Sequence, residues 1–396
     1  MSGIFIHGIG AVSPAGWGVS ALREALLRGE PLPAKELTRP GWTRPLRVRQ
    51  VPAPTPRLAF MAHTRLRRTS PIAHYAVGTA LEALGEDAVK YSGGSQLGII
   101  FCAMSGCVNY SRRFYDEVLK EPATASPLVF PETVFNAPAS HLAALLGATA
   151  ISYTLVGDPG IFLNGLALAA DWLLSERVDG CLVIGAEEMD WLAADAMRLF
   201  DKNTMVSDGA GAVYLRREAN RSRPGVRTHV GSTPSPRPDG ERARVRETEL
   251  ETKSLLSPDL SSLGGAEGEE TAAQTRTPAI QLRAITSPQL FTKNQTRALA
   301  ARRARAEIPA AGQNVLLCDG LLGIARADRD EQSAWRDWTG ARLSPKKILG
   351  EGLMAAAAWQ CVAALDALAQ NQYTAANVSV VGCNEQAIAV QFVRVV

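Results

Sequence analysis

Residues 163–184 have the sequence LNGLALAADWLLSERVDGCLVI. The first part, Leu163–Leu174, is apolar on almost every side, which is typical of a helix buried between other layers. The last part, Gly180–Ile184, is a short apolar run, which predicts a strand buried on both faces. Leu97–Ala103 is a second run of this kind. Buried strands that alternate with helices predict an α/β fold with a covered sheet.

The alternation continues toward both ends of the chain. Toward the N-terminus we expect a strand at Ile4–Ile9, a helix at Val19–Leu27, and an amphipathic helix at Ser70–Leu84 that Ser70 and Pro71 begin. Toward the C-terminus we expect these elements: a helix at Thr296–Arg305, a strand at Asn314–Cys318, a helix at Leu353–Ala369, and strands at Val378–Val381 and Ala387–Val393. Two α/β parts around a variable middle suggest an internal duplication.

Length and composition restrict the class of protein. The chain has 396 residues, of which 46% are hydrophobic and 20% charged, as expected of a globular protein with a large core. A net charge of +3 does not favour a nucleic-acid binder. No apolar run approaches the ~18 residues of a membrane span. Six scattered cysteines without a CxxC pair, and an N-terminus without a signal peptide, predict a cytoplasmic protein with reduced thiols.

The middle of the chain differs from both ends. No Phe, Trp or Tyr occurs between Tyr214 and Phe291, and Gly231–Thr277 is rich in Pro, Ser, Gly, Glu and Arg. Such a composition buries too little apolar surface to order a chain. It is typical of a solvated linker, with a partner-binding tail as the alternative. We therefore expect an N-terminal half at 1–218, a polar flexible linker at 219–277 and a C-terminal half at 278–396.

Motifs for cofactor and metal binding are absent from the sequence. Gly8-Ile9-Gly10 resembles the start of a dinucleotide-binding fingerprint, but Ser13 stands where the third glycine belongs. There is no P-loop, HExxH or GxSxG motif, and no cluster of His and Cys with metal-ligand spacing. We therefore expect no cofactor and no metal.

The order of several segments resembles the β-ketoacyl synthases of the thiolase superfamily. These segments are Gly8–Pro14, Gly157-Asp158-Pro159, Val183–Glu187, Phe200-Asp201-Lys202, Ser207–Ala212, Lys346–Glu351 with Ala355–Ala358, and Val381–Gln386. The resemblance covers the chain except for roughly Gly231–Thr277. It implies a thiolase-like fold of duplicated αβαβα layers, in which two similar halves pack together.

The resemblance also implies which residues stand at the family's catalytic positions. The family uses a cysteine at a helix N-terminus and two histidines for Claisen condensation. Counting back 28 residues from Glu187 gives Pro159 at the nucleophile position, and the histidine positions hold Asp319 and Glu351. No histidine follows His229, so no shift of the alignment restores them. We expect no catalytic residue for condensation.

Other residues of the implied site are retained or altered. Lys346 remains at its family position, and we expect Glu351 to pair with it. Residues expected to line the former pocket are Asp158, Phe162, Cys318, Lys346, Gly382 and Cys383. Cys318 and Cys383 suit small buried hydrophobes, with a replacement nucleophile as the alternative. Asp158, Asp319 and Glu351 are also candidates for an acid–base cluster.

The resemblance implies a partner role. Inactive chain-length-factor subunits pair with an active ketosynthase and shape the tunnel for the acyl chain, which acyl carrier protein delivers. We expect such a heterodimer here, in fatty-acid-like, polyketide or aryl-polyene biosynthesis. Chain-length factors usually carry glutamine at the old nucleophile, so Pro159 leaves the subgroup open. The alternatives are an acyl-thioester enzyme with altered chemistry and a scaffold that binds acyl carrier protein.

Two surface segments are candidates for partner contacts. Val129–Leu146 resembles the family's segment near the interface and the tunnel, although its composition favours ordinary core and loop. The carrier's acidic helix would meet Arg112 and Arg113, or the group Arg65, Arg67 and Arg68. An ordinary solvated face is the alternative for both groups of arginines.

Overall fold

The computed structural model describes residues 3–92, 96–147, 151–217, 279–310 and 312–395. These described residues belong to one compact unit. The predicted linker at 219–277 lies outside the described residues. The division of the chain into 1–218, 219–277 and 278–396 stays a prediction.

The N-terminal half is a sheet in which parallel and antiparallel strands are combined. The strand order is β6-β5-β7-β9-β1, with bounds β1 Ile4–Ser13, β5 Leu97–Ala103, β6 Ile151–Val156, β7 Gly180–Glu187 and β9 Gly209–Arg217. β5 is parallel to β6 and to β7, whereas β9 is antiparallel to β7 and to β1. All seven residues of β5 are buried, because helices cover both faces of the sheet.

The C-terminal half repeats this arrangement. Its strand order is β13-β12-β14-β15-β10, with bounds β10 Ala279–Ile285, β12 Val315–Cys318, β13 Arg342–Leu343, β14 Ala375–Val381 and β15 Gln386–Val395. β12 is parallel to β13 and to β14, and β15 is antiparallel to β14 and to β10. Strand for strand, this is the order and direction of the N-terminal half. The topology therefore confirms the predicted duplication, and antiparallel pairing of β1 with β10 joins the two halves.

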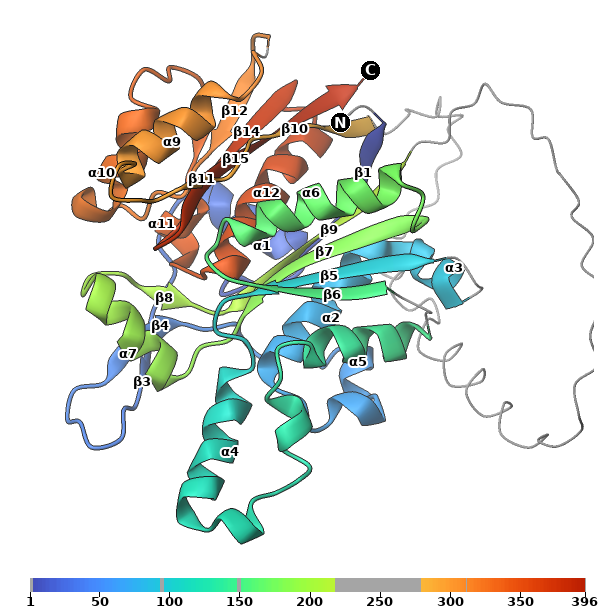
Figure 1. The fold of residues 1–396 in the computed structure, drawn as a ribbon, viewed down its shortest axis with the longest axis vertical. Coiled ribbons are helices and arrows are strands. Elements are labelled where there is room, and N and C mark those ends of the chain that lie inside the picture. The colour runs from blue at the N-terminus through green and yellow to red at the C-terminus, as the bar shows by residue number, and fades with distance from the viewer. Residues whose placement is uncertain (1–2, 93–95, 148–150, 218–278, 311, 396) are drawn as a thin grey trace, which may run out of the picture. The chain divides into compact units, whose positions relative to one another are not determined.

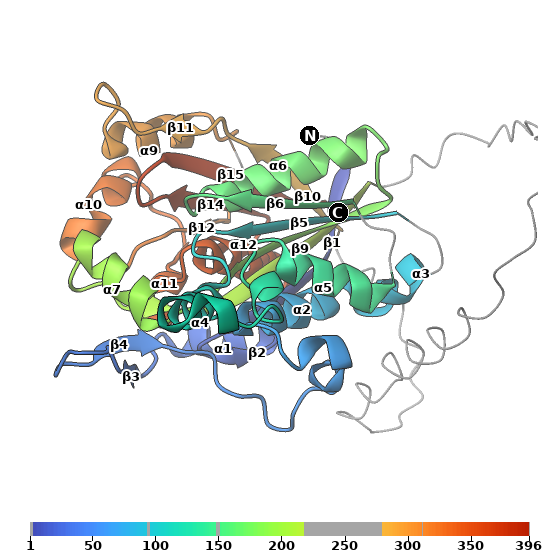
Figure 2. The ribbon, with the colours of Figure 1, turned by 60° about the horizontal axis from the view of Figure 1, so that its bottom comes forward.

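Helices form the other layers, as Figures 1 and 2 show. α6 (Ile161–Leu174) and α12 (Met354–Ala369) lie in the middle and contact strands of both halves. α2 (Pro71–Leu84) covers the outer face of the N-terminal sheet, and α9 (Arg297–Ala306) covers that of the C-terminal sheet. The layers therefore follow the predicted αβαβα order.

The remaining elements are connections and additions. They are α1 Val19–Arg28, α3 Ala88–Ser92, α4 Val108–Lys120, α5 Ala137–Leu146, α7 Trp191–Phe200, α10 Ala325–Ala334, α11 Pro345–Leu349, β2 Gly16–Trp17, β3 Lys35–Leu37, β4 Leu46–Arg49, β8 Val206–Ser207 and β11 Gln289–Leu290. β3, β4 and β8 form a small separate sheet. Among the described residues, no helix is long and apolar enough to cross a membrane.

The glycines of the Gly8-Ile9-Gly10 segment make room for a helix. A Cβ atom at Gly8 would lie 1.8 Å from the Ala83 carbonyl oxygen of α2, and one at Gly10 would lie 2.0 Å from that of Thr79. The two glycines therefore let α2 approach β1 closely. They do not end the strand, so β1 runs to Ser13 rather than stopping at the predicted Ile9.

The start of α2 also differs in detail from the prediction. Ser70 occupies the N-cap position, but its hydroxyl does not accept a hydrogen bond from the helix. It donates to the Glu188 carboxylate at 2.6 Å, and Glu188 accepts the backbone N–H of Ile72 at 3.0 Å. A carboxylate from the end of β7 therefore caps the helix in place of the hydroxyl.

Trp359 connects the two halves. This side chain of α12 is fully buried, and its indole N–H donates to the carbonyl of Val12 at 3.0 Å and to that of Ala210 at 2.9 Å. Val12 belongs to β1 and Ala210 to β9, so a helix of the C-terminal half bonds to strands of the N-terminal half.

Candidate functional site

Asp158 connects the turn before α6 to the loop between β14 and β15 by hydrogen bonds. β6 ends at Val156 and α6 begins at Ile161, so Asp158 and Pro159 lie in the buried turn between them. Asp158 Oδ1 accepts the N–H of Gly160 at 3.0 Å. Its Oδ2 accepts the N–H groups of Asn384 and Glu385, both at 2.9 Å. Neutral backbone donors therefore satisfy this buried carboxylate.

Gly382 permits this contact. A Cβ atom at Gly382 would lie 1.8 Å from Asp158 Oδ1. Any side chain at this position would therefore push the loop between β14 and β15 away from α6. The loop covers the helix end at which the resemblance places the nucleophile.

Asp319 directly follows β12 and is buried. Its Oδ1 accepts the hydroxyl of Ser344 at 2.6 Å and the N–H of Leu321 at 3.3 Å. Arg342 Nε lies 3.4 Å from Oδ2. Burial raises the pKa of Asp319, although the Ser344 hydrogen bond opposes this effect.

Glu351 forms the buried ion pair that the sequence predicted. Lys346 Nζ donates to Glu351 Oε2 at 2.8 Å, and both side chains are almost fully buried. Glu351 Oε1 accepts the N–H of Leu353 at 2.8 Å, just before α12 begins. Burial acts to lower the pKa of Lys346, but the charge and hydrogen bond of Glu351 outweigh it, so the pKa is raised and the ammonium stays charged.

Glu331 joins this group, although the sequence reasoning missed it. Its Oε1 accepts the N–H of Gly320 at 3.1 Å. A Cβ atom at Gly320 would lie 3.0 Å from Glu331 Oε2 and 3.6 Å from Lys346 Nζ, so both side chains face the same glycine. Burial, with the charge of Asp319, raises the pKa of Glu331 to about 7. One signal was available in the sequence, because Asp328, Glu331 and Trp335 recur at helical spacing. The structure shows that all three are buried.

The cysteines near the site are poor nucleophiles. Burial raises the pKa of the Cys318 thiol well above its usual range. Burial and the charge of Glu351 raise the pKa of Cys383 to about 12. Neither side chain provides a thiolate near neutral pH. Cys318 is buried and fits the expectation of a small buried hydrophobe, Cys383 is half-buried, and neither thiol suits a replacement nucleophile.

The three predicted carboxylates have separate partners within the described residues. Asp158 binds backbone N–H groups, Asp319 binds Ser344 beside Arg342, and Glu351 binds Lys346. This arrangement does not support a shared acid–base cluster.

Phe162 and Cys318 belong to the main apolar core, and Gly382 is buried. That these residues line a former pocket stays a prediction.

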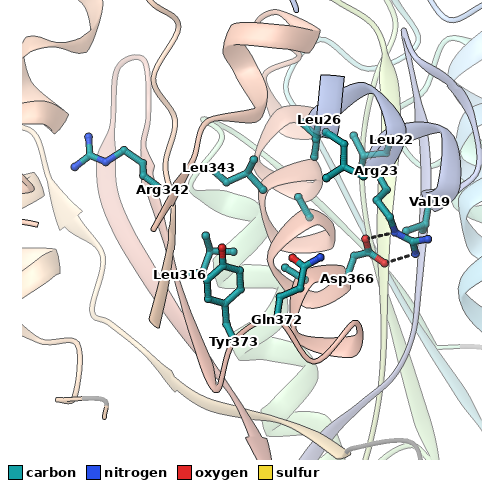
Figure 3. Close-up of a pocket in the computed structure, with 13 residues that line it drawn as sticks. Val19, Leu22, Arg23, Leu26, Leu316, Arg342, Leu343, Asp366, Gln372 and Tyr373 are labelled. Atoms are coloured by element: carbon teal, nitrogen blue, oxygen red, sulfur yellow. Dashed lines mark hydrogen bonds and ion pairs between the residues drawn. The ribbon is translucent and has the colours of Figure 1, made fainter. Parts of the chain in front are cut away.

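A cavity of about 170 Å³ borders the site (Figure 3). Its walls come from α1, α12, β12, β13 and the turn before β14, and its apolar lining includes Leu22, Leu26 and Leu316. Arg23 and Asp366 form an ion pair at its edge, with Arg23 Nε 2.7 Å from Asp366 Oδ2. Arg342 also lines it, and this side chain connects the cavity to Asp319.

Among the described residues, no group of three or more His, Cys, Asp or Glu side chains is arranged to hold a metal ion.

The two groups of candidate arginines differ. Arg112 pairs with Asp190 and with Asp116, and Arg113 pairs with Glu117 at 3.3 Å. Other arginines are exposed around a short 3-10 turn and have no acidic partner in the described part of the chain: Arg65, Arg67 and Arg68. Only this second group leaves its charge free for another molecule.

No family model and no curated protein matches the sequence. Solved structures do match the fold. A β-ketoacyl synthase from Burkholderia phymatum STM815 has a TM-score of 0.70 at 14% identity, over 100% of both chains. The ishigamide ketosynthase/chain length factor has a TM-score of 0.69 at 17% identity, over 100% of both chains. A type II PKS acyl-carrier protein in complex with its ketosynthase bound to the hexaketide has a TM-score of 0.69 at 14% identity, over 99% of both chains. This chain therefore has the thiolase-like fold of the ketosynthases and chain length factors.

Proposed function

We propose that this chain is a noncatalytic subunit of the chain-length-factor type, which pairs with an active ketosynthase and shapes its acyl tunnel. One observation carries the proposal. Where the resemblance expects a cysteine and two histidines, the chain has Pro159, Asp319 and Glu351, and internal partners occupy both acids. The pathway expected is polyketide, aryl-polyene or fatty-acid-like biosynthesis.

The chemistry of these residues opposes condensation. Proline offers no nucleophilic atom, and its ring suits the first turn of a helix. Decarboxylative condensation develops negative charge on an enolate oxygen, which positioned hydrogen-bond donors must stabilise. Carboxylate oxygens at positions 319 and 351 would repel that charge. The buried polar groups therefore serve to hold loops together rather than to activate a thioester.

The free edge of the N-terminal sheet is the surface we assign to the ketosynthase. β6 has a neighbouring strand on one side only among the described residues, and Tyr153 is 54% exposed and Val156 53% exposed. In the turn before α5, Phe130 is 55% exposed and packs against Phe114 of α4, with ring centroids 5.4 Å apart. Long exposed edges and apolar patches are typical of surfaces that another chain covers.

The unpaired arginines support a carrier-protein partner. No acidic residue occurs between Glu36 and Glu82, and Arg65, Arg67 and Arg68 lie within that interval. The turn is held in place, because Leu66 is buried and its carbonyl contacts His74 Nε2 at 2.8 Å. A rigid cationic surface of this kind fits the acidic helix of an acyl carrier protein.

Co-expression with an intact ketosynthase from the same gene cluster tests the pairing. We expect a stable 1:1 heterodimer by native mass spectrometry. Tyr153→Lys on β6 should abolish it, because the charge would be buried in the interface. Leu290→Lys, a matched change at an exposed leucine of β11, should leave it intact. A homodimer that ignores the ketosynthase would contradict the proposal and favour the scaffold alternative.

The same heterodimer tests the absence of catalysis. Asp319→Asn and Glu351→Gln keep the shape of each side chain but remove its charge. We expect condensation by the heterodimer to be unchanged, and replacement of the ketosynthase's own cysteine to abolish it. A heterodimer that stays intact but loses activity with either variant would favour the enzyme alternative. So would an acyl adduct on this chain, detected by mass spectrometry after incubation with acyl thioester.

A further inference from the structure

The cavity between α1 and α12 has an apolar lining on most of its sides (Figure 3). Leu22 of α1 and Leu316 of β12 are buried in its wall, and so are Ala363 and Ala367 of α12. The two alanines are four residues apart, so they lie on the same face of α12. Protein interiors are usually packed without voids of this size. The small side chains of α12 therefore leave a space that larger ones would fill.

The walls of the cavity are held in place by hydrogen bonds. Arg23 of α1 donates to both carboxylate oxygens of Asp366 of α12, with Nε 2.7 Å from Oδ2 and Nη2 2.5 Å from Oδ1. After α12, the N–H of Gln372 donates to the carbonyl of Ala367 at 3.1 Å, which fixes the turn before β14. The cavity is therefore formed in the free chain, as most sites for small molecules are.

One side of the cavity opens at the protein surface. Leu27 of α1 belongs to the lining and is 74% exposed. Gln372 also belongs to the lining and is exposed. An exposed leucine beside an apolar interior gives an apolar molecule a favourable path out of water. A small ligand can therefore enter between α1 and the turn before β14.

The polar groups of the lining differ in whether they already have partners. Arg23 and Asp366 satisfy each other. The guanidinium of Arg342 points away from the cavity (Figure 3) and donates to the carbonyl of Trp335 at 3.0 Å. Tyr373 lies in the turn before β14, and its hydroxyl has no hydrogen-bond partner in the described part of the chain. This hydroxyl is therefore available to a ligand.

The side chain of Tyr373 stands at one wall of the cavity. Figure 3 shows its ring beside Leu316, with the hydroxyl directed toward Leu343. Both leucines line the cavity as well. A tyrosine hydroxyl donates and accepts hydrogen bonds, so it can bind a hydroxyl group of a ligand. Because the charges of the lining are already paired or point away, a charged ligand would lack a counter-charge, and an uncharged ligand is favoured.

The size of the cavity limits the ligand further. Its volume is about 170 Å³. An apolar cavity of about 150 Å³ holds one molecule of benzene. A single six-membered ring with one hydroxyl group therefore fits, whereas a second ring does not. A ring is favoured over a chain of equal size, because it loses less conformational freedom on binding.

We propose that this cavity is a binding site for a small uncharged molecule of the phenol class, whose ring packs between α1 and α12 and whose hydroxyl group bonds to Tyr373. The site does not depend on the proposed function. It lies at β12 and β13, at one end of the strand order, whereas the surface assigned to the ketosynthase lies at β6, at the other end. A ligand in the cavity stabilises the folded chain, because it binds only that state.

Titration of the full chain with phenol tests the site. Leucine methyl groups labelled with ¹³C are followed by NMR. We expect saturable shifts at Leu22, Leu26 and Leu316, with half-saturation on the order of 1 mM. Leu142, a buried leucine of α5, should not shift. The absence of any shift, or shifts that rise linearly and include Leu142, overturns the proposal.

Ala367→Leu should close the site, because the larger side chain fills the cavity. Saturable binding of phenol should be lost. Ala306→Leu, the matched change at an exposed alanine at the end of α9, should leave binding unchanged. Circular dichroism shows whether each variant folds. Saturable binding that persists in folded Ala367→Leu overturns the assignment of the site to this cavity.

Tyr373→Phe tests the hydrogen bond without filling the cavity, and it remains informative if Ala367→Leu does not fold. The affinity for phenol should fall about fivefold, as expected for the loss of one hydrogen bond. The affinity for benzene should stay the same. Unchanged affinity for phenol, or an equal loss for phenol and benzene, overturns the assignment of phenols as the ligand class. Because every titration uses the chain without a ketosynthase, failure of the proposed function leaves these outcomes unaffected.

Discussion

The two middle helices occupy equivalent places in the two halves, and a buried acid precedes each one. Asp158 comes before α6 and accepts the amide two residues later, that of Gly160, at 3.0 Å. Glu351 comes before α12 and accepts the amide two residues later, that of Leu353, at 2.8 Å. In both halves, a buried acid therefore accepts a backbone N–H group at the start of the middle helix.

The second oxygen of each acid has a different partner. That of Asp158 accepts two backbone N–H groups of the loop between β14 and β15, whereas that of Glu351 accepts the ammonium of Lys346. Backbone N–H groups therefore hold the start of α6, here called the N-terminal or neutral joint. An ion pair holds the start of α12, here called the C-terminal or charged joint. Loss of a buried charge partner is more damaging than loss of a neutral hydrogen bond. The two joints should therefore respond differently to substitution.

The largest effect is expected at the charged joint. Lys346→Met leaves Glu351 buried without its cation and should lower the free energy of unfolding by about 3 to 5 kcal/mol. Urea unfolding monitored by circular dichroism measures this loss. The double variant Lys346→Met, Glu351→Met removes both charges and should lose less than the single one. Equal losses in both variants would show that packing rather than charge governs this joint.

A smaller effect is expected at the neutral joint. Asp158→Ala removes the acceptor of three backbone N–H groups, and those of Asn384 and Glu385 lie in exposed residues that water reaches. The free energy of unfolding should fall by about 2 kcal/mol. Asp158→Asn keeps one acceptor oxygen and should recover part of the loss. If Asp158→Ala costs as much as Lys346→Met, the contrast between the joints is wrong.

The pH dependence of stability distinguishes the acids around the charged joint. The pKa of Glu331 is about 7 in the folded chain, above its usual 4.5, so its contribution to stability is present in acid and is lost as the pH rises toward 7. Glu331→Gln should reduce the slope of unfolding free energy against pH by about 1 kcal/mol per pH unit in this window. Unfolding in urea at pH 5, 6 and 7 measures it.

The smallest effects on stability are expected at the surfaces of the two halves. Arg67→Glu in the N-terminal half and Arg302→Glu on α9 both replace exposed arginines, and each should change the free energy of unfolding by less than about 0.5 kcal/mol. Only Arg67→Glu should weaken binding of acyl carrier protein by the heterodimer, as measured by titration at low salt. Equal weakening by both variants would remove the distinction between the two surfaces.

Sequence reasoning succeeded where the determinant is local. The buried strand at Leu97–Ala103 follows from an unbroken apolar run, and the Lys346–Glu351 pair follows from two opposite charges five residues apart. It failed where the partner is distant. The donors to Asp158 lie 226 and 227 residues away, and Glu188 joins two helices that begin far from it in sequence. No local pattern encodes such contacts.

The indole of Trp359 has a consequence for how the chain folds. Its hydrogen bond to Val12 spans 347 residues, and the one to Ala210 spans 149. Contacts of such sequence separation close large loops and slow folding. On a ribosome, β1 and β9 are synthesised long before their indole partner exists. The packing of β1 and β9 is therefore completed only after α12 has emerged.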